Sequence, residues 1–442
     1  MADIPLISNY ATGAVFAHGG ERPVRVEEFL GEVEALARVL PGRRHLVNLC
    51  ADRYRFAVGL GAALLRGQLS LFPPNSTPDL LRRLGHAYPD VYCLSDGSAE
   101  SLQLETFLYP SMGMRAAPGP IPRFPETQAA AVLFTSGSTG EPVPHAKSWG
   151  SLARSGSAEV ERLGLGGSEM VLLATVPPQH MYGLESTVLM AMQGGLAIHA
   201  GRPFFPADVC AALEALPRPR ALVTTPVHLR ALVAEAGALP RVDFLLCATA
   251  PLSPQLAAEA EGRFAAPLFE IYGCTEAGQV ASRRPTQAQE WRLLSGLRLR
   301  LDGNRARVSG GHVESEVLLG DVIELRSEST FLLHGRTADM VNIAGKRTSL
   351  THLNFHLNSI PGVRDGAFVM PEEDDGAVTR LMAFVVAPGM SSDAVMSALR
   401  QRIDAAFLPR PLCFVESLPR NETGKLPRVA VDLLLRRLAK VG

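Results

Sequence analysis

The sequence predicts an α/β protein: a large N-terminal domain of layered α/β sheets plus a β portion, followed by a small C-terminal α+β domain. Its 442 residues exceed what one ordinary hydrophobic core organises, so two or three domains are expected. Short apolar runs alternate with Ala/Leu-rich helical stretches over most of the chain, which is typical of parallel sheets covered by helices. From about Trp291 the runs become shorter and glycine turns separate them, which indicates an antiparallel portion.

The strands and helices of the large domain can be predicted in chain order. Apolar runs bounded by turn residues predict strands at 44–50, 68–72, 130–134, 171–176, 221–225, 243–248 and 267–271. Residues that favour helices fill the intervals between several of these runs, as at 56–66 and 253–264. The antiparallel portion is predicted as short strands at 297–301, 305–308, 313–318 and 322–325.

The C-terminal part has its own sequence of elements. We predict a helix near 349–357, strands at 363–369 and 380–386, a helix at 391–407 and a polar loop around 418–426. About 100 residues in this order suffice for a compact α+β domain. The boundary is therefore placed after residue 337, giving predicted domains of 1–337 and 338–442.

Charge and cysteine usage limit the class of protein. Lys and Arg total 43 against 44 for Asp and Glu, so the net charge of -1 gives no reason to expect broad binding to nucleic acid or to an anionic membrane. The apolar run 58–65 is far too short to span a bilayer, and residues 1–13 do not resemble a secretory signal. Six scattered cysteines without a Cys-x-x-Cys pair suit a reducing compartment. We expect a cytoplasmic enzyme.

The strongest functional motif follows the predicted strand 130–134. It reads Thr135, Ser136, Gly137, Ser138, Thr139, Gly140, Glu141 and Pro142. Closely spaced hydroxyls and glycines form a turn whose N–H and O–H groups can surround phosphate oxygens. The kinase-type phosphate loop would need Lys and then Ser or Thr after Gly140, and a nucleophile elbow would need Ser in place of Thr139. The motif belongs to neither class.

Three further motifs follow in order. The first is 271–276, Ile-Tyr-Gly-Cys-Thr-Glu; the second joins Gly320-Asp321 to 333–339; and the third is 418–428, which contains Thr423-Gly424-Lys425. Together with the hydroxyl-rich turn, these motifs resemble those of the acyl-adenylate-forming superfamily, which includes acyl-CoA synthetases, aryl acid ligases, peptide-synthetase adenylation domains and luciferases. The resemblance extends from about Leu46 to Arg428 and implies a large ATP- and acid-binding domain with a mobile C-terminal domain.

The resemblance implies a role for each motif residue. The residues that it assigns to ATP are Thr135, Ser136, Gly137, Ser138, Thr139, Gly140, Tyr272, Gly273, Thr275, Asp321 and Arg336. Within this set, 136–140 would surround the β- and γ-phosphates, Tyr272 would stack on adenine, and Thr275 would contact the α-phosphate. Asp321 would accept hydrogen bonds from the ribose with the help of Arg336.

Catalysis is assigned to a metal ligand and to three side chains. Glu276 would hold Mg²⁺, a hard cation that suits carboxylate oxygen. The predicted catalytic residues are Lys425, His180 and Thr275, with Lys425 neutralising charge as the carboxylate attacks the α-phosphate. Because a flexible ammonium can arrive and leave with its domain, a lysine suits that position.

The chain departs from the superfamily pattern at two positions. Val143 occupies the place where relatives usually carry a phosphate-loop lysine, and the next cation is Lys147. Whether Lys147 takes over that role is left open. The aspartate expected at the hinge is replaced by Ala338, with Asp339 next to it, and we interpret this pair as the pivot between the domains.

The resemblance also locates an acid-binding region. His180 is the candidate gate of the acid pocket, and Ala248, Thr249 and Ala250 are expected to line it. Segment 179–181 offers no carboxylate for a substrate ammonium, so a plain carboxylic acid is favoured over an amino acid. Residues 140–147 look similar to ligases of aryl-polyene pigments and acyl-carrier loading. We therefore expect an aryl acid delivered to phosphopantetheine on an acyl carrier protein, or to CoA.

Two alternatives remain open from the sequence. One is an enzyme that stops at the acyl-adenylate or oxidises it, as luciferases do. The other is a non-catalytic nucleotide-binding relative, which Val143 and Ala338 would suit and which the retained Glu276, Asp321 and Lys425 oppose. The principal prediction is an AMP-forming carboxylic acid:thiol ligase that uses ATP and Mg²⁺.

Overall fold

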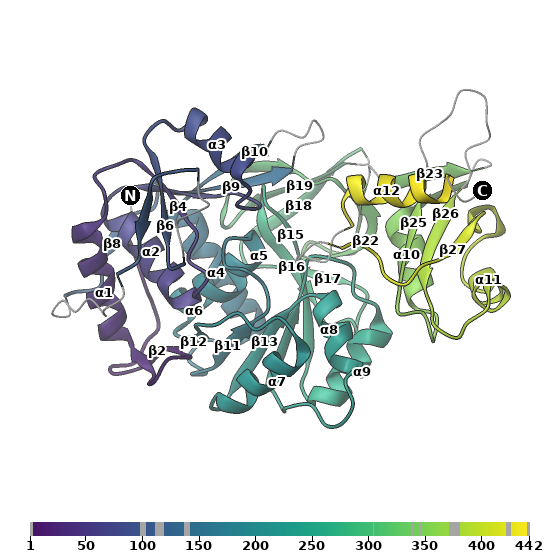
Figure 1. Cartoon of the computed structure of the whole chain (residues 1–442), viewed down its shortest axis with the longest axis horizontal. Coiled ribbons are helices and arrows are strands. Elements are labelled where there is room, and N and C mark those ends of the chain that lie inside the picture. Colours follow the sequence, from purple (N-terminus) through teal and green to yellow (C-terminus); the bar gives the residue numbers. More distant parts are fainter. Residues whose placement is uncertain are drawn as a thin grey trace.

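The structure is a computed structural model that describes residues 3–97, 103–110, 119–136, 142–303, 305–336, 339–343, 346–370, 381–420 and 426–439. In Figure 1 the large domain occupies most of the long axis of the molecule, and the small domain lies at one end of that axis. Buried apolar side chains form clusters drawn from residues 4–333 and separate clusters drawn from residues 341–435. The predicted α/β class with a small α+β domain is confirmed. The boundary after residue 337 falls outside the described residues and stays a prediction.

The first sheet of the large domain holds the strand that leads into the hydroxyl-rich motif. In spatial order its strands are β10 (Pro142–Ser148), β9 (Ala129–Ser136), β5 (Leu69–Phe72), β4 (His45–Asn48), β6 (Val91–Ser95) and β7 (Thr106–Leu108). Neighbours pair in parallel except β9 and β10, which form an antiparallel hairpin. A small antiparallel pair, β1 (Asp3–Pro5) with β8 (Arg123–Pro125), lies outside this sheet.

The central sheet of the large domain is longer and of mixed type. In spatial order its strands are β21 (Asp321–Leu325), β22 (Thr330–Arg336), β17 (Trp291–Leu293), β16 (Gly278–Arg283), β15 (Leu268–Cys274), β14 (Phe244–Cys247), β13 (Arg220–Thr224), β11 (Val171–Ala174), β12 (Ala197–His199), β2 (Val15–His18) and β3 (Val24–Arg25). The strands from β15 to β2 pair in parallel, whereas β16, β17, β22 and β21 continue in antiparallel fashion. The antiparallel strand arrangement predicted from about Trp291 onward is therefore confirmed.

Helices cover the two sheets. They are α1 (Val26–Val39), α2 (Arg53–Leu65), α3 (Pro78–Ala87), α4 (Trp149–Leu163), α5 (Met181–Gly183), the π-helix η1 (Leu184–Leu189), α6 (Met190–Gly194), α7 (Pro206–Ala215), α8 (Pro226–Val233) and α9 (Pro254–Phe264). Helix α2 is buried over nearly its whole length, which explains why apolar and small residues fill it. Among the described residues, no helix is both long and apolar enough to cross a membrane.

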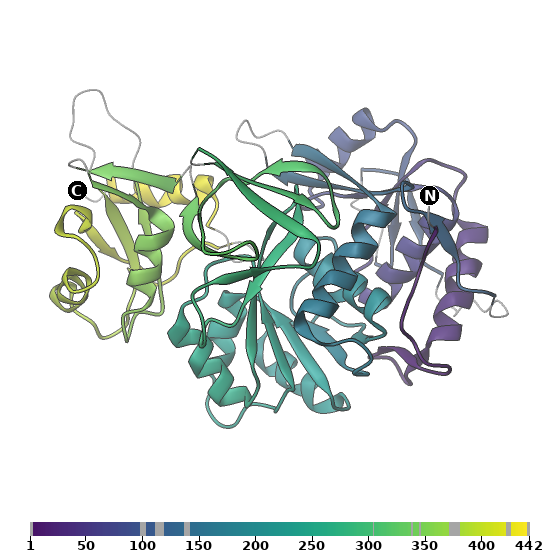
Figure 2. The same cartoon turned by 180° about the vertical axis from the view of Figure 1, so that it is seen from behind.

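The remaining strands of the large domain form a separate antiparallel sheet of β18 (Leu297–Asp302), β19 (Arg305–Gly310) and β20 (Val313–Leu318). Seen from behind in Figure 2, this green sheet lies in front of the central sheet. Its inward side chains, including Ala306 and Val308, join the apolar cluster of β16 and β17. The sheet therefore covers the antiparallel half of the central sheet.

The small domain has its own sheets and helices. They are β23 (Met340–Ile343) paired with β24 (Lys346–Ser349), the sheet of β25 (Asp365–Val369), β26 (Met382–Val386) and β27 (Leu412–Phe414), the helices α10 (Leu350–Asn358), α11 (Ser392–Arg400) and α12 (Arg428–Ala439), and the 3-10 turn η3 (Ala405–Phe407). The single helix predicted over 391–407 is wrong, because it ends at Arg400 and Asp404 caps the separate turn η3. Strand β27 and helix α12 were not predicted.

Candidate functional site

The predicted site residues follow the carboxyl ends of neighbouring strands. In the central sheet, β11, β13, β14 and β15 run in parallel, so their last residues meet at one edge. This edge carries the acid-pocket loop after β14 and the turn after β15. Open α/β sheets bind their ligands in the crevice outside the carboxyl ends of parallel strands. The topology therefore brings the predicted acid-binding and ATP-binding segments together.

The adenine and ribose residues predicted from separate motifs are in contact. The hydroxyl of Tyr272 on β15 donates a hydrogen bond to Oδ2 of Asp321 on β21, with 2.7 Å between the oxygens. The ring of Tyr272 packs against Trp291 and Phe331, with ring centroids 5.6 and 5.8 Å away. Asp321 begins a strand rather than lying in a turn, and the backbone of Arg336 is its partner on β22. The side chain of Arg336 lies outside the described residues.

Thr275 and Glu276 lie in the tight turn between β15 and β16, and two glycines allow this turn to form. A Cβ at Gly273 would lie 2.4 Å from the carbonyl oxygen of Gly278 on the opposite strand. Gly278 itself has φ of +78°, and a Cβ there would meet Oε1 of Glu185 at 2.7 Å. Larger residues at these positions would push the two strands or the buried carboxylate apart. The glycines thus fix where Thr275 and Glu276 are presented.

The hairpin of β9 and β10 approaches the same turn from the first sheet. Thr135 and Ser136 are the last residues of β9, so the predicted turn starts later than the sequence suggested. Residues 137–140 and the side chain of Ser136 lie outside the described residues, and their phosphate role stays a prediction. Thr135 Oγ1 is 3.0 Å from Nε2 of His145, and that nitrogen is 3.7 Å from Oε1 of Glu276. The end of β9 therefore reaches the turn after β15 through His145.

Lys147 supports this turn from below. Its ammonium donates a 2.5 Å hydrogen bond to the backbone carbonyl of Glu276, and the residue is only 7% exposed. Burial lowers the pKa of Lys147, and Glu185, Cys274, Glu314 and Glu276 oppose that shift. Because its ammonium is committed to a main-chain carbonyl, Lys147 occupies a supporting position beneath Glu276. The spacing of residues in the sequence did not show which group the ammonium of Lys147 would contact.

A buried polar network continues beneath the turn. Glu185 on η1 accepts hydrogen bonds from the Ser155 hydroxyl and from the backbone N–H of Gln279, at 2.5 and 3.3 Å. Glu159 on α4 accepts from the Ser186 hydroxyl and the Gln279 amide, at 2.7 and 2.8 Å. Burial raises the pKa of Glu159 to about 8 and that of Glu185 to about 7. The network joins α4, η1 and β16, and the motif search gave no sign of it.

His180 is the first of the residues predicted to bind the acid. This residue caps the short helix α5, because its Nδ1 accepts a 3.3 Å hydrogen bond from the backbone N–H of Tyr182. The hydroxyl of Tyr182 lies 3.1 Å from each of the carbonyl oxygens of Thr224 and Leu246, near the ends of β13 and β14. His180 thus lies at the start of a helix, and its role as the acid gate stays a prediction.

The loop after β14 adopts an unusual backbone conformation. Thr249 has φ of +81°, a left-handed conformation that a β-branched residue rarely adopts. Such strain persists only where the surroundings enforce it, and it gathers at functional sites. Ala248 is buried, while Thr249 and Ala250 are partly exposed. The segment that the sequence assigned to the acid pocket is therefore a constrained part of the chain.

A cluster of threonine and histidine side chains at the ends of β11 and β13 and on α8 was missed by the sequence analysis. Thr175 Oγ1 lies 2.9 Å from Thr224 Oγ1 and 3.3 Å from Nδ1 of His228, and Thr225 Oγ1 lies 3.1 Å from the same nitrogen. The ring of Phe204 meets the ring of His228 edge to face, with centroids 5.0 Å apart. These residues lie in separate segments of the chain, so no local motif indicates that they form a cluster.

The small domain meets the large one through a group of charged residues. Asp365 on β25 accepts two 2.8 Å hydrogen bonds from the guanidinium of Arg420. Nη1 of Arg230, on α8 of the large domain, lies 3.6 Å from Oδ1 of the same aspartate. Arg420 precedes Lys425 by five residues. Lys425 and the hinge residue Ala338 lie outside the described residues, and both assignments stay predictions.

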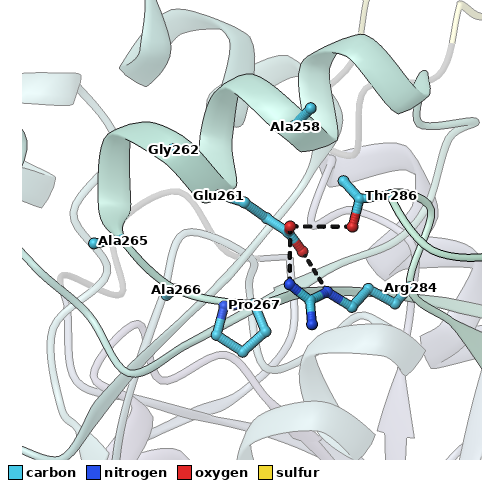
Figure 3. A pocket seen from close by; sticks show the side chains of 8 residues that line it. All are labelled: Ala258, Glu261, Gly262, Ala265, Ala266, Pro267, Arg284 and Thr286. Atoms are coloured by element: carbon cyan, nitrogen blue, oxygen red, sulfur yellow. Dashed lines mark hydrogen bonds and ion pairs between the residues drawn. The ribbon is translucent and has the colours of Figure 1, made fainter.

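A hollow elsewhere on the large domain is separate from these residues. The hollow has a volume of about 550 Å³. Figure 3 shows that Glu261 of α9 is paired with Arg284 at its lining, with Thr286 beside them. Glu261 also accepts from the backbone N–H of Leu268, the first residue of β15. The hollow thus lies near the amino end of β15, whereas Tyr272 and Thr275 lie at or beyond its carboxyl end. An ion pair already satisfies its charged groups.

The chain belongs to the AMP-binding enzyme family. The family model of the AMP-binding enzyme matches residues 84–313, and the model of the AMP-binding enzyme C-terminal domain matches residues 356–425. These matches confirm the superfamily predicted from the four motifs. The chain is therefore an ATP-dependent, AMP-forming ligase.

Curated relatives include acid–CoA ligases. The chain is 28% identical over 305 residues to a 4-coumarate–CoA ligase of Rhodobacter capsulatus, covering 67% of this chain and 74% of the relative. It is 24% identical over 338 residues to a 2-succinylbenzoate–CoA ligase of Listeria monocytogenes, covering 71% of each.

Solved structures share the fold. The anthranilate CoA ligase AuaEII in complex with anthranoyl-AMP superposes with a TM-score of 0.82 at 16% identity, covering 99% of each chain. This likeness extends over both domains and supports the fold assignment alone.

Proposed function

We propose that this ligase activates an aryl carboxylic acid as its acyl-adenylate and transfers the acyl group to the thiol of CoA. In the first step a carboxylate oxygen attacks the α-phosphorus of ATP, a new P–O bond forms, and pyrophosphate leaves. In the second step the thiolate sulfur attacks the acyl carbon, a C–S bond forms, and AMP leaves. The observation that carries the proposal is the contact between Tyr272 and Asp321, which joins the predicted adenine and ribose residues at the sheet edge beside Thr275.

Mg²⁺ would enter this site together with ATP. Among the described residues, no group of three or more His, Cys, Asp and Glu side chains is arranged to hold a metal ion. Glu276 offers one carboxylate, and its side chain is 42% exposed at the turn. Mg²⁺ is commonly held by one or two carboxylates together with phosphate oxygens and waters, so the residues present fit it. When bound, Mg²⁺ supplies positive charge against the phosphates, and the contribution of this chain is to hold Glu276 in place.

An aryl acid is supported by the substrates of the curated relatives, and the residues near the proposed acid pocket are compatible with it. The named substrates of the curated relatives, 4-coumarate and 2-succinylbenzoate, both carry an aromatic ring. The residues near the proposed acid pocket include the small Ala248 and the uncharged Thr249, with the aromatic Tyr182 nearby. Small, uncharged and aromatic side chains are compatible with a planar ring.

The first test is a screen of acid-dependent ATP–pyrophosphate exchange over benzoates, cinnamates and fatty acids. We expect exchange with aryl acids and much weaker exchange with fatty acids. Product analysis with CoA and with a phosphopantetheine-loaded carrier protein then identifies the acceptor. The carrier remains a candidate because residues 140–147 are similar to carrier-loading ligases. Exchange supported only by fatty acids would contradict the aryl proposal.

The role of His180 can be tested in the same assay. Because His180 caps α5, its replacement by Asn keeps a capping side chain while changing the shape offered to the acid. We expect His180→Asn to change the order of preferred acids while the affinity for ATP stays within about threefold. An unchanged order of acids would remove His180 from the gate.

A further inference from the structure

Strand β10 points three side chains toward the predicted ATP site. Because successive side chains of a strand alternate between its two faces, Val143, His145 and Lys147 lie on the same face. Val143 lies nearest the hydroxyl-rich motif and pairs with Thr135 on β9, and it is 44% exposed. Lys147 lies furthest along the strand and is buried beneath the turn after β15. His145 stands between them.

His145 touches both elements to which the ATP phosphates and the metal are assigned. Its Nε2 lies 3.0 Å from the hydroxyl oxygen of Thr135 and 3.7 Å from a carboxylate oxygen of Glu276. Its side chain is 16% exposed, whereas that of Glu276 is 42% exposed. The histidine is therefore held between the end of β9 and the turn, with one ring nitrogen aimed at both.

β10 thereby fixes Glu276 at two points. Lys147 binds the main-chain carbonyl of Glu276, and His145 lies against the carboxylate of the same residue. The backbone contact fixes where the turn lies, and the side-chain contact influences where the carboxylate points. An exposed glutamate without such a neighbour samples several rotamers, which weakens metal binding because the rotamers must be frozen.

The first position of this face carries no charge. Val143 is aliphatic, so it can neither donate a hydrogen bond to a phosphate oxygen nor offset its charge. Lys147 is committed to the carbonyl of Glu276 and is buried. Among the described residues of this face of β10, His145 is thus the side chain with a ring nitrogen placed beside both Thr135 and Glu276.

We propose that His145 is a positioning residue of the Mg²⁺–ATP site, which orients the Glu276 carboxylate and the Thr135 hydroxyl and supplies the polar contact that Val143 lacks. The inference rests on the proposed binding of ATP at this edge. The inference predicts a difference between two nucleotides. His145 should contribute to the binding of the metal and of the β- and γ-phosphates, and AMP lacks those phosphates. A residue that merely holds the hairpin together would affect both nucleotides alike.

The test is calorimetric titration of the full chain with two probes. One is AMP, and the other is an ATP analogue with a methylene bridge between the α- and β-phosphates, used with and without Mg²⁺. The variants are His145→Ala, His145→Gln, which keeps an amide N–H near the position of Nε2, and His86→Ala, which changes an exposed histidine on α3.

We expect His145→Ala to bind the Mg²⁺-loaded analogue up to about tenfold more weakly, the upper range for one lost hydrogen bond, and to bind AMP within about twofold of the wild type. His145→Gln should recover most of the loss, and His86→Ala should bind like the wild type. Equal weakening toward AMP and the analogue, full affinity in His145→Ala, or no recovery in His145→Gln would each overturn the inference. A wild-type chain that binds neither probe would instead overturn the proposed function.

Discussion

The turn that carries Thr275 and Glu276 is fixed by buried contacts, whereas the segment that leads to Lys425 is attached through charged side chains where the domains meet. Beneath the turn, Lys147 is 7% exposed and hydrogen-bonds the backbone of Glu276. At the junction, the side chains of Arg230 and Arg420 are 29% and 19% exposed, and both interact with Asp365.

The turn and the junction between the domains differ in how costly their contacts are to break. Breaking a buried polar contact leaves groups without water or partner, which is costly, so the turn stays in place. The pair between Arg230 and Asp365 joins the two domains, and a partly exposed ion pair costs little to break, so this contact would not prevent the small domain from separating. Under the proposed function, the residues that receive ATP must hold still, while a lysine needed for one half-reaction must be free to withdraw. The predictions below test each side of this comparison.

The largest effect is expected at Lys425, the lysine predicted in the small domain. Lys425→Ala should reduce acid-dependent ATP–pyrophosphate exchange about 10²- to 10³-fold, the range seen when one electrostatic stabiliser of a transition state is removed. Transfer from a supplied acyl-adenylate to the thiol should be preserved, because the lysine is needed while charge builds at the α-phosphate. Equal losses in adenylation and in transfer to the thiol would contradict a role of Lys425 in adenylation alone.

The next effect is expected at the turn that carries Glu276. Lys147→Met replaces the ammonium with an apolar group of similar length, so the Glu276 carbonyl loses its partner. We expect the KM for ATP to rise about tenfold. The melting temperature should also fall, because the carbonyl of Glu276 is left without its buried partner. A variant that keeps the wild-type KM would show that the turn is held by other contacts.

A smaller effect is expected where the domains meet. Arg230→Ala removes the large-domain partner of Asp365, and a partly exposed pair contributes about 0.5–1 kcal/mol. Exchange should fall about two- to fivefold, thioester formation from a supplied adenylate should not fall, and the salt dependence of exchange should weaken. Arg218→Ala, which breaks an ion pair with Asp243 inside the large domain, is the matched control. An identical response in both variants would argue against a role between the domains.

The smallest effect on activity is expected in the buried network, where pH gives the readout. Burial raises the pKa of Glu159 from 4.5 to about 8, so the folded state keeps a proton that the unfolded state has released between these values. Its contribution to stability is complete below about pH 4.5 and is lost as the pH rises through about 8. The melting temperature of Glu159→Gln should therefore increase relative to that of the wild type as the pH rises from about 4.5 to about 8. Glu161→Gln, an exposed neighbour on α4, should show no such trend.

Much of the fold followed from local patterns. The strands and helices predicted between residues 44 and 325 correspond to observed elements with ends shifted by a few residues, because period and turn residues are read over short windows. The errors fall where local signals are weak. The predicted helix 391–407 stops at Arg400, and Thr135 and Ser136 extend β9, where pairing with β10 keeps two hydroxyl residues in a strand.

The sequence by itself determined the family, because its four motifs are local runs of residues whose order and spacing can be read directly. Only the tertiary structure decided which side chains meet. Tyr272 and Asp321 are 49 positions apart, and Lys147 and Glu276 are 129 positions apart. Such contacts depend on strand order, register and the close approach that Gly273 and Gly278 permit. These quantities are set by the packing of whole sheets, which no short window of sequence contains.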